Sequence, residues 1–352
     1  KFGLGLGPGS CYPAGSAADR TAARFGGDLR KGTRTVDHWA RIDPQMREAL
    51  EIQNKLLPDW PVCPTVEGLP QLRALYEKER RHWNQDPPQL PKVTDLVLAG
   101  PARDIPLRFY HPQTEEARPA VVYVHGGGWI LGNLNTHDRI MRLLAAASGL
   151  TVIGVDYCLS PEHKFPAAHE EVRFVANHLA AQGADYGLDP SRLAFAGDSA
   201  GANMSLSACL TPLEANPDAI AGAVLYYGLF GLRDSASQRR FAVLDASMNE
   251  ANLAFYRDCL LRSPGDAKDP RYDIFRADLT SLPPVFVAAA ELDPIYDDSV
   301  LLADRLGDLG KPCDFKVYPG VLHGFLLHSR VVEQAQRAIA DGGAWLKRRL
   351  LP

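Results

Sequence analysis

The sequence predicts an α/β fold built on a mostly parallel sheet, and three observations lead to this prediction. First, eight short runs rich in β-forming residues occupy the chain after residue 91. Second, most of these runs are continuously apolar, as is typical of strands that are buried on both faces. Third, helical stretches separate the later runs, and such strand–helix alternation is typical of parallel sheets. The predicted strands span 94–100, 105–112, 120–126, 150–157, 192–199, 219–228, 284–293 and 313–320.

The chain before the first strand has two parts. Residues 1–36 are rich in glycine and contain no apolar block long enough for a signal peptide. We interpret them as a flexible leader without chemistry, derived from cloning or from a misassigned start. Residues 37–90 contain two amphipathic helical stretches, at 43–57 and 66–84, and are predicted to form N-terminal cap helices.

The main α/β domain is predicted to span residues 91–352. An insertion at about 229–283 is longer than one crossover requires, and contains the helix-like segment 247–263. We expect this insertion and the N-terminal helices to cover one end of the sheet together. The helices that separate the later strands are predicted at 134–148, 166–183, 200–213, 296–309 and 331–350.

Composition narrows the classes of function. Of the 352 residues, 46% are hydrophobic and 23% are charged, as in an ordinary globular protein. A net charge of −4 provides no basic footprint for nucleic acid or for acidic membranes, and no apolar run is long enough to span a bilayer. The six cysteines show no metal-ligand spacing and are expected to be reduced, mostly buried thiols of a cytoplasmic protein.

The strongest chemical signal is the pentapeptide Gly197-Asp198-Ser199-Ala200-Gly201, which matches the pattern G-x-S-x-G. It stands directly after a predicted strand and before a predicted helix. In that context the two glycines permit a sharp turn that projects the serine hydroxyl from the edge of the sheet. A helix capped by Ser199 would explain one glycine but not both, so we predict that Ser199 is a nucleophile.

A run of three glycines follows the strand at 120–126. Attack by a serine on an acyl group creates an oxyanion, which needs preorganised N–H donors about 3 Å away. We predict that Gly127, Gly128 and, behind the nucleophile, Ala200 supply these donors. His125 and Gly126 are included in the predicted oxyanion hole, with His125 as the residue whose ring holds the glycine turn in place.

A nucleophilic serine needs a base and an orienting carboxylate. Asp293 ends the strand at 284–293, and His323 lies in the loop after the last strand, so these two complete the predicted triad. Asp297 and Asp298 are interpreted as charges in the first turn of a helix. His328 is expected at a helix start or on the surface and is not assigned as the base.

Five motifs in order resemble the hormone-sensitive-lipase-like branch of the α/β-hydrolases, and in particular bacterial acetyl esterases of the enterobacterial type. The motifs are HGGGW at 125–129, DYCLSPEHKFPA at 156–167, GDSAG at 197–201, DPIYDDS at 293–299 and HGF at 323–325. The resemblance implies an eight-stranded α/β-hydrolase fold with helices on both faces and a helical cap. It also implies a cytoplasmic carboxylesterase that acts on short acyl esters without a cofactor or a metal. Enzymes of this branch often form homodimers.

The sequence therefore predicts a serine carboxylesterase for small short-chain esters, with no nucleic-acid or membrane partner. Trp129, Tyr227 and Leu229 are candidates for the walls of the acyl pocket, although core packing explains each equally well. Cleavage of amides, lactones or peptides by the same triad is an alternative, because function resides in the pocket and not in the fold. A regulatory ligand-binding protein on an inactive hydrolase fold is a second alternative.

Overall fold

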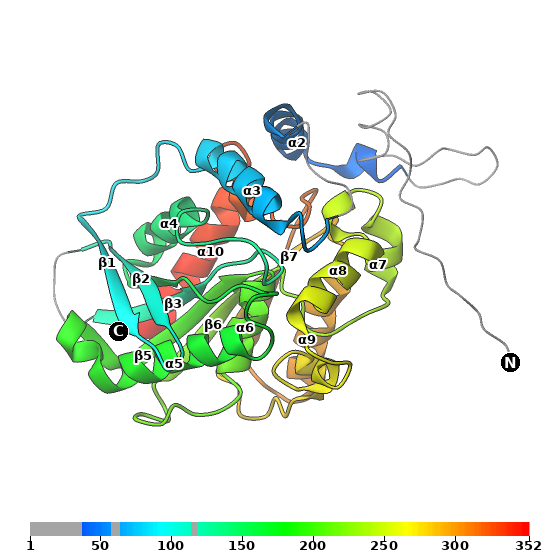
Figure 1. Ribbon diagram of the computed structural model, residues 1–352. Helices are drawn as coiled ribbons and strands as arrows, with labels where there is room; N and C mark the ends of the chain where they lie inside the picture. The colour runs from blue at the N-terminus through cyan, green and yellow to red at the C-terminus, as the bar shows by residue number, and fades with distance from the viewer. Residues whose placement is uncertain (1–36, 58–63, 114–117, 352) are drawn as a thin grey trace, which may run out of the picture.

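The computed structural model describes residues 37–57, 64–113 and 118–351 (Figure 1). The predicted leader at 1–36 lies outside the described residues. The eight strands are β1 (Lys92–Ala99), β2 (Asp104–His111), β3 (Arg118–Val124), β4 (Thr151–Val155), β5 (Leu188–Asp198), β6 (Ile220–Tyr226), β7 (Val285–Ala290) and β8 (Cys313–Tyr318).

All eight predicted strands are present and form one sheet in the order β1-β2-β4-β3-β5-β6-β7-β8. β1 and β2 pair antiparallel with each other, and β2 pairs antiparallel with β4. The remaining neighbours are parallel. The prediction of a mostly parallel eight-stranded sheet is thus confirmed.

Both faces of the sheet are covered by helices, which explains the continuous apolar runs. Successive side chains of β3 enter different cores: Val122 and Val124 pack in one, and Val121 and Tyr123 in the other. Helices α5, α6 and α9 contribute to the first core, and α4 and α10 to the second. These helices are α4 (Asp138–Ser148), α5 (Ala167–Gln182), α6 (Ala200–Ala208), α9 (Tyr296–Asp308) and α10 (Glu333–Leu350).

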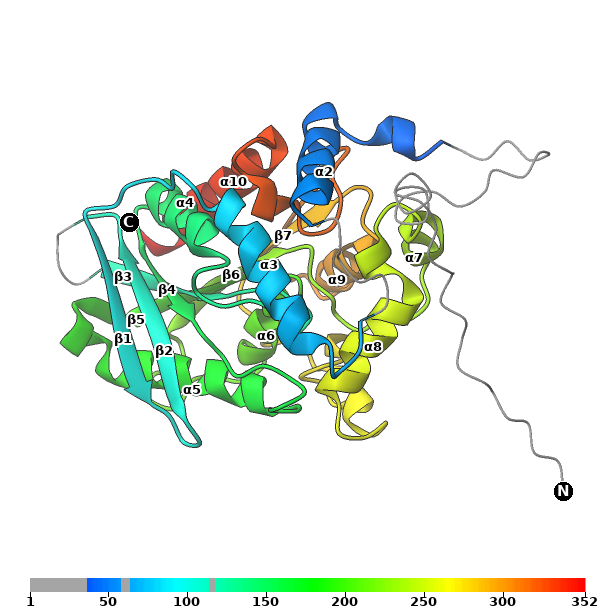
Figure 2. The same ribbon diagram turned by 45° about the horizontal axis from the view of Figure 1, so that its top comes forward.

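The cap combines two segments that are far apart in the sequence. The N-terminal helices α2 (Pro44–Leu56) and α3 (Leu69–Trp83) lie over the same end of the sheet as α7 (Ala236–Phe241) and α8 (Glu250–Leu260) (Figures 1 and 2). A separate apolar cluster joins the two segments to the loop after β3. It consists of Leu69, Leu72, Ile130, Leu131 and Cys259, with Tyr76, Phe255 and Tyr256 packed against it.

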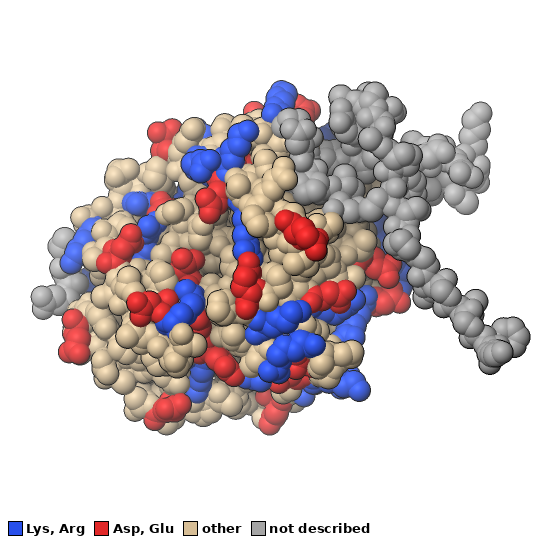
Figure 3. Space-filling model, viewed as in Figure 1, with Lys and Arg blue, Asp and Glu red and all other residues tan. Residues whose placement is uncertain are grey.

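The surface seen in Figure 3 carries basic and acidic side chains side by side. None of the helices in the described ranges combines the length and the apolar composition that crossing a bilayer requires. The four cysteines in the described part of the chain are free thiols, and three of them are buried.

Candidate active site

Ser199 occupies a strained turn between β5 and α6. Its φ of +53° and ψ of −120° lie in a region that non-glycine residues rarely adopt, so the surrounding structure must hold it there. The flanking glycines allow this turn to pack. A Cβ atom on Gly201 would lie 2.0 Å from the carbonyl oxygen of Val124, and one on Gly197 would lie 2.6 Å from the backbone of Gly201. Both glycines are therefore required by close backbone approach.

Three predicted residues from three different loops form one hydrogen-bonded chain. The Ser199 hydroxyl donates to Nε2 of His323 over 2.8 Å, and Nδ1 of His323 donates to Oδ2 of Asp293 over 2.7 Å. The other oxygen of Asp293 accepts the N–H of Ile295 at 2.9 Å, which fixes the orientation of the carboxylate. Asp293 is only 1% exposed, so this alignment is protected from water.

The environment of His323 favours its charged form. Burial alone would lower the pKa, but the charge and hydrogen bond of Asp293, together with the charge of Asp245, raise the pKa of His323 above 6.5. The ring of Tyr227 packs edge-on against the imidazole at 5.0 Å. The imidazole is therefore held in place and is prepared to accept a proton.

His328 differs from its expected position. It is 4% exposed in the short helix η6 (Phe325–His328), and its ring packs edge-on against Trp83 with centroids 4.7 Å apart. Burial, together with Arg80, lowers the pKa of His328 well below 6.5. The sequence could not indicate this burial, because it depends on Trp83 from the distant helix α3. No hydrogen bond links His328 to Ser199 among the described residues.

The glycine loop after β3 presents its backbone to Ser199. Gly127 has a φ of +121°, and a Cβ there would lie 2.2 Å from the carbonyl oxygen of Leu131. Gly127, Gly128 and Ala200 all line the same cavity as Ser199. Within the described ranges, the N–H groups of these three residues have no hydrogen-bond acceptor. They are available as donors for a developing oxyanion.

The N–H of Gly126 and Nδ1 of the His125 ring already have hydrogen-bond acceptors, which corrects the inclusion of Gly126 as a free donor of the oxyanion hole. The N–H of Gly126 already donates to Oδ1 of Asp198 at 3.0 Å. His125 is 1% exposed, stacks on Tyr157 at 4.2 Å, and donates from Nδ1 to the carbonyl oxygen of Gly126. His125 thus holds the glycine turn from behind, as the sequence suggested for its ring.

Asp198 is a site residue that the sequence analysis missed. Although burial raises its pKa, His137 and the Tyr123 hydroxyl outweigh this effect and lower the pKa below 3.8. Its Oδ1 accepts both the Tyr123 hydroxyl at 2.8 Å and the N–H of Gly126. Asp198 therefore connects the nucleophile turn to the glycine loop. The sequence contained one sign of this role, because Asp198 directly precedes Ser199 in the pentapeptide.

Asp298 lies in the first turn of α9, as predicted, but its role goes beyond that of a charge near the start of a helix. The residue is 1% exposed, and its Oδ1 accepts three backbone N–H groups, those of Phe230, Gly231 and Leu232. Burial raises the pKa of Asp298 to about 7, although the three N–H groups oppose this shift. Asp298 fixes the loop after β6, which places Leu229 in the cavity.

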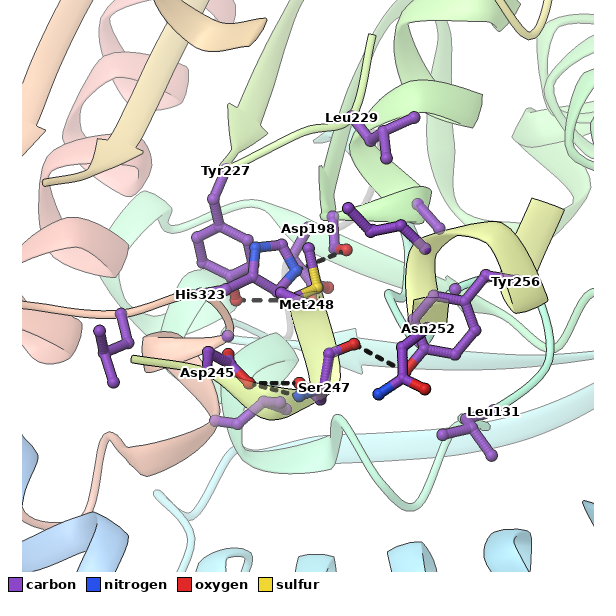
Figure 4. A pocket seen from close by; sticks show the side chains of 18 of the residues that line it. Leu131, Asp198, Tyr227, Leu229, Asp245, Ser247, Met248, Asn252, Tyr256 and His323 are labelled. Carbon is purple, nitrogen blue, oxygen red and sulfur yellow. Dashed lines mark hydrogen bonds between the residues drawn. The ribbon is translucent and has the colours of Figure 1, made fainter. Parts of the chain in front are cut away.

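The cavity beside Ser199 has a volume of about 190 Å³. Trp129, Tyr227 and Leu229 all line it, as the sequence analysis suggested. Another part of its wall comes from the cap segment that carries Asp245, Ser247 and Met248, which are labelled in Figure 4. Within the described residues, no group of three or more His, Cys, Asp or Glu side chains could hold a metal ion.

The geometry agrees with the relationships found by comparison. A family model described as alpha/beta hydrolase fold matches residues 121–327. The chain belongs to the alpha/beta hydrolase family. The family predicted from the motifs is thereby confirmed, whereas the closer likeness to bacterial acetyl esterases stays a prediction.

Solved structures of other hydrolases share the fold over nearly their whole length. A hyperthermophilic esterase from the archaeon Pyrobaculum calidifontis is 31% identical, with a TM-score of 0.81, and the match covers 88% of this chain and 98% of that one. A thermostable carboxylesterase cloned from a metagenomic library is 30% identical, with a TM-score of 0.78 and coverage of 81% and 98%. A thermostable esterase from Pseudomonas putida is 24% identical, with a TM-score of 0.79. The match covers 92% of this chain and 100% of that one, and it shows that the two proteins share a fold.

One further residue ties the cap of this hydrolase to its glycine loop. Arg73 of α3 donates to the carbonyl oxygens of Ile130 and Ser160, each at 2.9 Å, and forms a two-pronged ion pair with Glu162. The sequence offered no sign of this role, because Arg73 stands on an otherwise ordinary amphipathic helix.

Proposed function

We propose that this hydrolase is a serine carboxylesterase of the acetyl esterase type, which cleaves short-chain acyl esters. The observation that carries the proposal is the hydrogen-bonded chain from Ser199 through His323 to Asp293, beside N–H groups that have no acceptor in the described part of the chain. The esterase names of the related structures support the same reaction class.

In the proposed mechanism, Ser199 attacks the ester carbonyl while His323 takes its proton. The Asp293 carboxylate stabilises the imidazolium that forms. The N–H groups of Gly127, Gly128 and Ala200 bind the oxyanion, and each such donor is worth about 3 to 4 kcal/mol of barrier lowering. His323 then passes the proton to the leaving alcohol, and a water activated by His323 releases the acid from Ser199.

The preference for short acyl chains rests on the shape of the cavity. Trp129, Tyr227 and Leu229 are large side chains on its walls, and the whole cavity measures about 190 Å³. Each additional buried methylene gains about 0.8 kcal/mol until the pocket is full, after which longer chains clash or stay in water. A cytoplasmic location and a homodimer belong to this proposal through the resemblance to the acetyl esterases.

The test is covalent labelling by a fluorophosphonate, followed by hydrolysis of p-nitrophenyl acetate. Ser199 should be the labelled residue, and Ser199→Ala should lose turnover by at least about 1000-fold with an unchanged melting temperature. Ser207→Ala is the matched control, because Ser207 lies in helix α6, which begins directly after Ser199. This variant should retain activity. Labelling elsewhere, or retention of a tenth of the activity by Ser199→Ala, would contradict the proposal.

A further inference from the structure

The cavity has two chemically different walls. Trp129, Leu229 and Tyr272 contribute large, mostly hydrocarbon side chains to its lining. The wall formed by the cap segment around η3 (Ala246–Met248) carries Asp245 and Ser247. In Figure 4, Leu229 lies on one side of His323, and Asp245 and Ser247 lie on the other. The acyl half and the alcohol half of an ester bound at Ser199 would therefore contact different kinds of side chain.

The direction of proton transfer decides which half meets the polar wall. His323 protonates the leaving oxygen, so the alcohol half must begin within hydrogen-bond reach of Nε2 of His323. Asp245 and His323 both line the cavity, and the negative charge of Asp245 helps to raise the pKa of His323. An ester with its alcohol half on the Asp245 side of His323 would direct its acyl half toward Leu229 on the other side (Figure 4).

Asp245 retains an oxygen for a ligand. Its Oδ1 accepts the N–H of Ser247 at 2.9 Å and the Ser247 hydroxyl at 2.6 Å, which is an ordinary helix-capping arrangement. Among the described residues, none donates a hydrogen bond to Oδ2 of Asp245. Capping explains one oxygen and the orientation of the side chain, and leaves the second oxygen as an acceptor at the cavity wall.

The wall around Asp245 is held rigidly, which allows it to discriminate between ligands. Asn252 donates from Nδ2 to the carbonyl oxygen of Ala246 at 2.6 Å, and the Tyr256 hydroxyl donates to the carbonyl oxygen of Ser247 at 3.2 Å. The N-cap Asn249 accepts the N–H of Asn252 at 2.9 Å, which anchors the start of α8. A preorganised acceptor loses little entropy when it binds a donor.

We propose that Asp245 is a specificity-determining residue that accepts a hydrogen bond from a hydroxyl group on the alcohol half of the ester. The inference rests on the proposed esterase function and deepens it. The preferred substrates are then short acyl esters of glycols and other polyols, and not esters of simple alkyl alcohols.

The experiment compares two esters of the same size, 2-hydroxyethyl acetate and propyl acetate. The kcat/KM of the wild-type enzyme should be about tenfold higher for the hydroxyl-bearing ester. A hydrogen bond to a charged acceptor stabilises a complex by about this factor. Asp245→Asn should lower the ratio toward one, because its amide oxygen can keep the cap on Ser247 while an NH₂ donor replaces the charged acceptor Oδ2. Glu250→Gln removes a charge from an exposed position at the start of α8 and should leave the ratio unchanged.

The outcomes separate this inference from the proposed function. A wild-type ratio near one, or an unchanged ratio in Asp245→Asn, would overturn the inference while leaving the esterase intact. If Asp245 acted only through the charge of His323, both esters would change equally and the ratio would stay constant. Absence of turnover of both esters would overturn the proposed function and this inference with it.

Discussion

Replacement of Asp298 offers a quantitative test of how the site is supported. Asp298→Ala removes the acceptor of the N–H groups of Phe230, Gly231 and Leu232, which lie at 2.6, 2.9 and 3.2 Å. The first of these bonds is buried and the other two are partly buried. A buried donor left without a partner costs about 1 to 3 kcal/mol, and partly buried donors cost less because water can replace the carboxylate. We expect a total loss of about 3 kcal/mol in the free energy of unfolding.

Two other variants calibrate this loss. Asp298→Asn keeps Oδ1 as an acceptor and should cost less than about 1 kcal/mol, since a neutral group already suits this buried position. Asp297→Ala is the matched control. The neighbouring carboxylate accepts a single N–H, that of Ser237 at 2.9 Å, so its removal should cost about 1 kcal/mol.

The assay is urea unfolding followed by circular dichroism, with comparison of the midpoints at equal slopes. The pH dependence provides an internal check. An acid whose pKa is raised from 3.8 to about 7 holds more protons when folded than when unfolded, so its contribution to stability falls as pH rises through that interval. Asp298→Asn should lack this decline. Equal losses in Asp298→Ala and Asp297→Ala would refute the reasoning.

Four further predictions concern turnover. Because only unprotonated His323 can act as the base and its pKa is raised, kcat/KM should rise with pH through a midpoint above 6.5, and a midpoint below that value would contradict the assignment. His323→Ala should abolish ester hydrolysis, whereas buried His328, which lacks a bond to the triad, should be replaceable by Gln with a loss below about tenfold. Asp293→Asn should favour the wrong imidazole tautomer and reduce kcat by about 10⁴-fold at neutral pH without unfolding the protein, as shown by an unchanged circular dichroism spectrum. In a series of p-nitrophenyl esters, kcat/KM should peak between acetate and hexanoate and fall at least about tenfold by decanoate, so a maximum at decanoate would indicate a lipase.

Much of the fold could be predicted because burial leaves a direct mark on the sequence. The run that became β3 is apolar at every position from Ala120 to Val124, and both faces of that strand are covered. Element ends were harder to predict. β5 begins at Leu188, four residues before its predicted start, because Leu188 pairs with Arg118 beyond a register shift in the sheet. Pairing partners of this kind are not visible in a local pattern.

The meeting of Ser199, Asp293 and His323 could be predicted because each follows a strand whose end was recognisable. The supporting residues could not, because their roles depend on partners that are distant in the sequence. Asp298 binds the backbone of residues 66 to 68 positions earlier, and Arg73 binds a carbonyl 57 positions later. Gly126 illustrates the same limit, because its N–H donates to Asp198, which lies 72 positions later in the sequence.

The bridge from Arg73 to the glycine loop has a consequence for engineering. Exchange of cap segments between related enzymes is an obvious way to change substrate range, and it treats the cap as a separable module. Here the guanidinium of Arg73 binds the carbonyl groups of Ile130 and Ser160, which lie outside the cap helices. A graft that supplies α3 without an arginine at this position would leave Glu162 and both carbonyl groups without their donor. A successful chimera should therefore inherit Arg73 and Glu162 as a pair, whatever else of the cap is replaced.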